Sequence, residues 1–244
     1  MEGYTYREGL KDGIPIALGY LLVSTGFGIT AVNCGLPVIT SVLISMTNLT
    51  SAGQVAGVEI IRDLYSGVTV FAVSALEMLI ATLMINLRYS LMAVSLSQKL
   101  DGSFTTGRRL LTGFFITDEI YAVASSKKGD ISSAYMLGLG TLPFFGWAAG
   151  TAAGAVCASL MPAELSNVFG IAIYGMFLSI VVPDCRKSAG VLLCSVCAAS
   201  LSCLLRFVPS LSVIPSGFRV IICALASSLA AAALFPREEE AEDE

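Results

Sequence analysis

Charged side chains inside otherwise apolar stretches are the residues of this chain whose chemistry matters first. Glu77 and Arg88 are the only formal charges between residues 67 and 98. A charged side chain at bilayer depth costs about 2.5–3.5 kcal/mol on insertion scales, so it faces a protein interior or a water-filled path. In an unbroken helix their spacing would place both on nearly the same face, about 16 Å apart. The alternative interpretation is structural, with one buried charge and one arginine that snorkels to the interface.

Two further polar groups could recognise an amino acid. Asn86, Arg88 and Tyr89 bring an amide, a guanidinium and a phenol close together, and a guanidinium can bind a carboxylate through two parallel hydrogen bonds. Asp118 and Glu119 lie in an apolar stretch, where either could hold an ammonium group or carry a proton. Both groups could instead mark segment ends at the membrane interface. Together they offer donors for a carboxylate and acceptors for an ammonium, and a zwitterion needs both.

The segment 36–58 is unusually polar for a stretch that could cross a membrane. Its hydroxyl and amide residues are Thr40, Ser41, Ser45, Thr47, Asn48, Thr50, Ser51 and Gln54. The S-x-x-Q spacing of Ser51 and Gln54 is that of a capping box, which predicts a helix that starts in mid-segment after a break at residues 47–50. A helix N-terminus at membrane depth suits a substrate carboxylate. The alternative is a continuous buried helix whose hydroxyls bond back to the i−4 carbonyls.

These observations give two sets of candidate residues and no catalytic or metal-binding set. We expect the substrate to be bound by Asn48, Thr50, Ser51, Gln54, Asn86 and Arg88. We expect charge pairing or proton coupling from Glu77, Asp118 and Glu119.

The elements that must position these residues are membrane helices. The chain is 55% hydrophobic and 13% charged, against about 25% charged residues in soluble domains. Apolar stretches predict an all-α, polytopic membrane protein with about seven or eight segments, and a broken or re-entrant helix in its N-terminal half. The segments are 14–34, 36–58, 67–98, 110–125, 133–160, 167–183, 189–207 and 216–235. The run 67–98 is too long for one ordinary span, which predicts a break near Asn86, and 110–125 is re-entrant or interfacial.

Basic residues set the expected orientation. They cluster before the first segment, at residues 99–109, at 127–128 and at 186–187, whereas the connections 161–166 and 208–215 have none. By the positive-inside rule the clusters are cytoplasmic, which leaves both termini inside. We expect one integral membrane domain over residues 1–235, with the motifs in the half 1–130 and the half 131–235 behind it. Residues 236–244 form an acidic tail that we expect to be disordered.

Composition excludes several functions. The net charge of −4 comes largely from the acidic tail and does not indicate nucleic-acid binding. The chain has no histidine, and its seven cysteines lie mostly in apolar segments, where they act as small hydrophobic residues. There is no Walker A motif and no G-x-S-x-G elbow. We therefore expect neither an enzyme nor a cofactor, and the remaining classes are a secondary transporter and a channel or structural membrane subunit.

Three glycines form a strip along one face of the segment 133–160. Gly146, Gly150 and Gly154 repeat at every fourth residue, and such strips let two membrane helices approach closely. The spacing predicts a close helix contact, either within the chain or with a partner.

At these residues the chain resembles the AzlC-type family of branched-chain amino acid permeases and exporters. The matching pieces are Arg7-Glu8-Gly9, Gly13-Ile14-Pro15-Ile16, Gly26-Phe27-Gly28, the stretch 45–54, Asn86-Leu87-Arg88-Tyr89, Thr117-Asp118-Glu119 and, in the second half, Trp147. The resemblance implies a multi-pass protein of the bacterial cytoplasmic (inner) membrane that moves hydrophobic amino acids, usually outward. It also implies a small hydrophobic AzlD-type membrane subunit. Family members often have histidine where this chain has Tyr89, and that departure bears on the substrate rather than on the fold.

Overall fold

The described part of the chain folds into helices and contains no named strand. The computed structural model describes residues 4–160, 172–208, 211 and 214–235; the connection at 161–166 and the tail at 236–244 lie outside these residues. The helices are α1 (Tyr6–Asn33), α2 (Val38–Thr47), α3 (Ser51–Tyr65), α4 (Phe71–Ser97), α5 (Thr106–Phe114), α6 (Asp118–Ser126), α7 (Ser133–Leu160), α9 (Ala172–Lys187), α10 (Ala189–Phe207) and α11 (Ser216–Leu234). Within this part, α1, α4, α7 and α10 are long and apolar enough to cross a membrane. The prediction of an all-α membrane protein is confirmed.

The chain divides into two compact units. Unit 1 contains residues 1–58 and 82–173, and unit 2 contains residues 59–81 and 174–244. The dividing points fall within α3, within α4 and in the first turn of α9, so α3 and α4 contribute substantially to both units.

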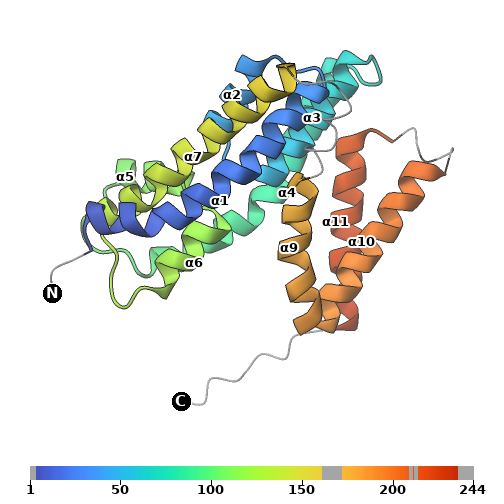
Figure 1. Cartoon of the computed structure of the whole chain (residues 1–244). Coiled ribbons are helices and arrows are strands. Elements are labelled where there is room, and N and C mark those ends of the chain that lie inside the picture. The colour runs from blue at the N-terminus through green and yellow to red at the C-terminus, as the bar shows by residue number, and fades with distance from the viewer. Residues whose placement is uncertain (1–3, 161–171, 209–210, 212–213, 236–244) are drawn as a thin grey trace. The chain divides into compact units, whose positions relative to one another are not determined.

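The α1–α7 pair forms the axis of unit 1, and the two helices run side by side in Figure 1. A Cβ atom on Gly146, Gly150 or Gly154 would lie 2.7, 2.1 or 2.0 Å from atoms of α1. The contact is reciprocal, because a Cβ on Gly28 of α1 would lie 2.2 Å from the Thr151 carbonyl oxygen. The glycine strip therefore packs within the chain, where backbone meets backbone.

The first interrupted helix is α2–α3, and its interruption lies at residues 48–50. Asn48 has an extended backbone (φ −143°, ψ 114°) that ends α2, and α3 begins at Ser51. The predicted break in mid-segment is therefore confirmed. The break expected near Asn86 is wrong, because α4 runs without interruption from Phe71 to Ser97. Asn86 is an interior residue of that helix, and a single amide in an otherwise apolar run does not stop helical hydrogen bonding.

The second interrupted helix, α5–α6, begins and ends on the same side of unit 1. The guanidinium of Arg108, near the start of α5, donates to Ser133 Oγ at the start of α7 (3.2 Å). At the end of α6, the Lys127 carbonyl accepts a hydrogen bond from Lys99 Nζ (2.9 Å), just beyond α4. Both ends of α5–α6 thus lie beside the N-terminus of α7, and the pair enters and leaves unit 1 on the same side. We call this side the basic end; its cations are Arg7, Lys11, Lys99, Arg108, Arg109, Lys127 and Lys128.

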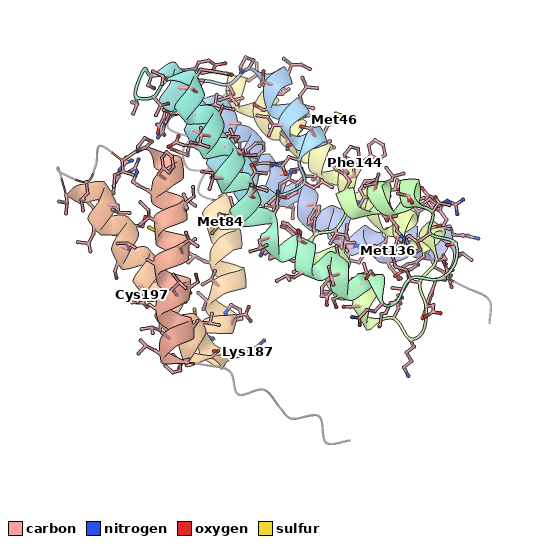
Figure 2. The ribbon with its side chains drawn as sticks, turned by 180° about the vertical axis from the view of Figure 1, so that it is seen from behind. Met46, Met84, Met136, Phe144, Lys187 and Cys197 are labelled. Carbon is pink, nitrogen blue, oxygen red and sulfur yellow. The ribbon has the colours of Figure 1, made fainter. Side chains whose placement is uncertain are left out.

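Unit 2 is built around the antiparallel pair α10–α11. Gly190, at the start of α10, lies beside Phe235, just after the end of α11. α9 joins the start of α10 through a hydrogen bond from Cys185 Sγ to Ser195 Oγ (3.4 Å). Figure 2 shows Lys187 at the junction of α9 and α10, and Cys197 further along α10.

Candidate functional site

A small cavity lies where the two interrupted helices of unit 1 meet. Its volume is about 230 Å³, somewhat below the roughly 300–1,000 Å³ of sites for drug-sized ligands. The lining residues are Thr47, Asn48, Leu49 and Thr50 from the first interruption, Asn86 and Tyr89 from α4, and Gly113, Phe114 and Ile116 from the second. We call it the central cavity. It combines amide and hydroxyl groups with an apolar wall, as a site for one small amphipathic molecule requires.

Three of the predicted residues come together at this cavity. The Thr50 amide donates to Asn48 Oδ1 (2.9 Å), which is a local turn that fixes the break between α2 and α3. The Thr50 hydroxyl donates to Asn86 Oδ1 (2.9 Å) and so ties the break to α4. Asn48, Thr50 and Asn86 therefore line one polar wall of the cavity.

Gln54 connects the interruption between α2 and α3 to α7. Its side chain is 1% exposed, its Nε2 donates to the Asn48 carbonyl, and its Oε1 accepts from Trp147 Nε1 (3.1 Å). The side-chain amide is therefore engaged with the break and with α7, and not with a capping box. Ser51 is the first residue of α3, half-buried, and does not line the cavity.

Arg88 and Asp118 form an ion pair between α4 and α6. Arg88 Nη1 lies 2.9 Å from Asp118 Oδ2, and Arg88 Nη2 donates to the Tyr89 hydroxyl (2.9 Å). The second oxygen, Asp118 Oδ1, is buried without a hydrogen-bond partner among the described residues. The guanidinium is thus already paired with a carboxylate of the chain itself, and that carboxylate keeps one buried oxygen without a partner in the described part of the chain.

Glu119 belongs to a chain of contacts that joins the two interruptions. Tyr20 of α1 donates its hydroxyl to Glu119 Oε2 (2.6 Å), and this hydroxyl also lies 2.5 Å from Thr117 Oγ1. The Tyr20 ring meets the Trp147 ring edge to face, with centroids 5.1 Å apart. Because Trp147 is hydrogen-bonded to Gln54, a continuous series of side-chain contacts connects α3 to α6. We call this series, Gln54–Trp147–Tyr20–Glu119, the relay.

Glu77 belongs to unit 2, whereas the other candidates belong to unit 1. Its side chain is fully buried, and the backbone of Phe218 in α11 is the polar group that interacts with its carboxylate. Asp63 of α3 and Arg219 of α11 are the charged groups that act on it electrostatically. Arg219 also lines a separate cavity of about 490 Å³ within unit 2.

Three residues with clear roles were not singled out as site residues from the sequence. Tyr20 and Trp147 form the middle of the relay, and Phe114 supplies part of the apolar wall of the central cavity. Trp147 is the only tryptophan of the chain, and it stands in a helix rich in glycine, which was the available signal. Tyr20 and Phe114 carry no such signal, because aromatic residues are common in membrane helices.

The fold and the site define a polytopic α-helical membrane protein with a small cavity between two interrupted helices. The chain matches the AzlC protein family over residues 15–161, which is more than half of its length, and it belongs to that family. The family is associated in general with branched-chain amino acid transport. The matched range contains both interrupted helices and all of α7.

Two relatives place the chain among membrane proteins. An "Uncharacterized membrane protein" of Archaeoglobus fulgidus is 24% identical over 183 residues, which cover 74% of this chain and 76% of that protein. The "Inner membrane protein YgaZ" of Escherichia coli K12 is 26% identical over 167 residues, which cover 64% of this chain and 62% of that protein. No solved structure matches the chain.

Proposed function

We propose that the chain is the large subunit of a secondary transporter that exports branched-chain or similar hydrophobic amino acids. In this proposal it acts together with a small AzlD-type membrane subunit, in the bacterial cytoplasmic (inner) membrane. The observation that carries the proposal is the central cavity, because two interrupted helices meet there with amide, hydroxyl and apolar groups around a space of about 230 Å³. Interrupted helices around a small site near mid-membrane are a recurrent arrangement in secondary transporters.

Each part of an amino acid finds a chemical counterpart near this cavity. The N-terminus of α3, with the polar groups of Asn48 and Thr50, suits a carboxylate, since helix N-termini attract anions. The unpartnered Asp118 Oδ1 suits an ammonium group. Phe114 and Ile116 suit a branched apolar side chain. In this arrangement Arg88 orients and compensates Asp118 rather than clamping the substrate.

We propose an energy source and an orientation for this transporter. The chain contains no Walker A motif, so we propose that a gradient, of protons or of the substrate itself, drives transport. The basic end of unit 1 gathers seven of the nine arginines and lysines of residues 1–130, all except Arg62 and Arg88. The positive-inside rule therefore assigns this end to the cytoplasm. The N-terminus is then cytoplasmic, and we propose the same for the C-terminus.

The test is flux of radiolabelled valine and leucine into inside-out vesicles, with and without the small subunit and an imposed proton gradient. We expect saturable accumulation that requires the subunit and is stimulated by unlabelled substrate on the far side. A channel would not show this exchange stimulation. Absence of any flux, with both subunits confirmed in the membrane, would overturn the proposal.

A site variant and a matched control sharpen this test. Thr50→Val removes the hydroxyl that bonds Asn86; the loss of one such bond, about 1–1.5 kcal/mol, predicts a roughly tenfold fall in transport. Thr25→Val removes a hydroxyl that bonds only to the Leu21 carbonyl of its own helix. We expect the control to transport at the wild-type rate, and equal rates for the two variants would exclude Thr50 from the site.

A further inference from the structure

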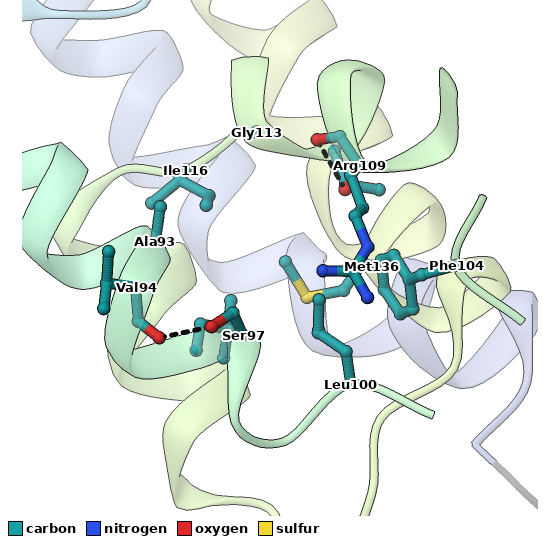
Figure 3. A pocket seen from close by; sticks show the side chains of 11 residues that line it. Ala93, Val94, Ser97, Leu100, Phe104, Arg109, Gly113, Ile116 and Met136 are labelled. Atoms are coloured by element: carbon teal, nitrogen blue, oxygen red, sulfur yellow. Dashed lines mark hydrogen bonds between the residues drawn. The ribbon is translucent and has the colours of Figure 1, made fainter. Parts of the chain in front are cut away.

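A second cavity opens in unit 1 toward the basic end. It has a volume of about 270 Å³ and lies between the C-terminal turns of α4, helix α5 and the first turn of α7 (Figure 3). Its walls are mainly apolar. The lining residues are Ala93, Val94, Leu96, Ser97, Leu100, Phe104, Arg109, Thr112, Gly113, Ile116 and Met136. We call this cavity the vestibule.

Among the residues that the structure describes, Arg109 is the one charged residue that lines the vestibule, and it is exposed. Figure 3 shows its side chain extending from α5 toward Leu100, Phe104 and Met136. Among the described residues the guanidinium has no ion pair and no hydrogen-bond partner. The neighbouring Arg108 differs, since its guanidinium donates to the Ser103 carbonyl (2.8 Å) and to Ser133 Oγ (3.2 Å). The Arg108 guanidinium thus has hydrogen-bond partners within the protein, whereas Arg109 has five N–H donors without a partner among the described residues, beside an apolar cavity.

The vestibule adjoins the central cavity. Gly113 and Ile116 line both spaces, so the end of α5 and the start of the second interruption form the partition between them. The two volumes are similar, about 270 and 230 Å³, which fits the same small molecule in either place.

We propose that the vestibule is a second binding site for the transported amino acid, which recognises its carboxylate through Arg109 and its apolar side chain through the surrounding wall. This inference rests on the proposed function. It also makes a distinction between the two sites. Among the residues that the structure describes, no carboxylate lines the vestibule, so nothing there recognises an ammonium group. Asp118 does not itself line the central cavity, but it is linked to the wall of that cavity through Arg88, which bonds Tyr89.

The distinction predicts what each site selects. An aliphatic monocarboxylate without an amino group binds in the vestibule about as well as leucine does. An amine without a carboxylate does not bind there, because the guanidinium would repel it. The suitable probes are therefore L-leucine, 4-methylpentanoate and L-leucinol, which share a branched chain and differ in their charged groups.

The experiment is equilibrium binding of the three labelled probes to the purified complex of the full chain with its small subunit. We expect 4-methylpentanoate to bind the wild type, and Arg109→Gln to weaken it tenfold or more, as expected for loss of a charge-assisted pair. Arg109→Lys keeps the charge and should retain part of the affinity. Arg7→Gln is the matched control, since it removes a guanidinium from the same end without touching the vestibule.

The outcomes separate this inference from the proposed function. Equal 4-methylpentanoate binding by Arg109→Gln and Arg7→Gln, in a complex that exports leucine, would overturn the vestibule site alone. Much tighter, Arg109-dependent binding of a long-chain fatty acid would identify a lipid site and would also overturn the inference. If the complex neither binds nor exports leucine, the proposed function fails first.

Discussion

The ion pair between Arg88 and Asp118 gives the sharpest test of the site. Replacing Arg88 with Gln, or Asp118 with Asn, removes a charge-assisted contact of 2.9 Å between α4 and α6. Such contacts are worth about 1.5–3 kcal/mol, which predicts a fall in transport of about tenfold to a hundredfold for Arg88→Gln or for Asp118→Asn. If the two side chains acted independently, the double variant would show the product of the two losses. Because the two side chains act as one unit, we expect the double variant to transport no more slowly than the more impaired of the two single variants.

The assay is exchange of labelled leucine in proteoliposomes, with each variant scaled to the amount of inserted protein. The four measurements form a double-mutant cycle, and we expect a coupling energy of about 1.5 kcal/mol or more. Lys187→Gln is the control. It also removes the cation of an ion pair, but that pair spans 3.8 Å and both side chains are mostly exposed, so we expect little change.

Two results would refute this reasoning. If the fold-loss of transport in the double variant equals the product of the two single losses, Arg88 and Asp118 have independent roles. That result is expected if Arg88 binds the substrate carboxylate. Normal transport by Arg88→Gln would remove both the clamp and the pairing role. Loss of inserted protein, read from the membrane fraction, would mark the pair as structural instead.

The remaining predictions concern the buried carboxylate of unit 2 and the glycine contact of unit 1. Glu77→Gln should flatten the pH profile of transport more than it lowers the protein level, since a fully buried acid becomes an amide that cannot titrate. An unchanged profile, measured from about pH 5 to about pH 8, would return Glu77 to a structural role. Gly150→Ala should lower thermal stability in detergent by about 1–3 kcal/mol through overpacking, because its Cβ would lie 2.1 Å from Ser24 Oγ. Gly19→Ala, where a Cβ meets nothing within 4 Å, should stabilise slightly, and equal effects of the two would argue against the packing explanation.

The interruptions could be predicted from the sequence because they have a local cause. Hydroxyl and amide residues in the middle of an apolar segment compete for backbone hydrogen bonds, and both Asn48 and Thr117 do so in the structure: Asn48 accepts from the Thr50 amide and Thr117 from the Ile120 amide. The glycine strip was readable for the same reason, since its spacing alone defines a face. The partner of that strip was not, because α1 and α7 are separated by about a hundred residues.

The site itself was only partly predictable, because its contacts join distant segments. Asn86 was expected at a break in its own helix and instead closes the break of another, through Thr50. Arg88 was expected to hold a substrate carboxylate and is paired with Asp118. The periodicity of one segment does not identify which residue of another segment will contact it. The residue types therefore predicted the chemistry of the site but not which side chains would pair with each other.

The relay explains how the two interruptions could act together in a transport cycle. Gln54 holds the first break and Glu119 stands at the start of α6, beyond the second, and Trp147 and Tyr20 connect them. Its two hydrogen bonds are worth about 1 kcal/mol for the neutral one and about 1.5–3 kcal/mol for the one to the carboxylate. Breaking both contacts would therefore cost a few kcal/mol, which is the size of gap that separates a minor conformation from a major one. In the proposed transport cycle, contacts of that size would stabilise one arrangement of the interrupted helices without preventing the other, as alternating exposure of the central cavity requires.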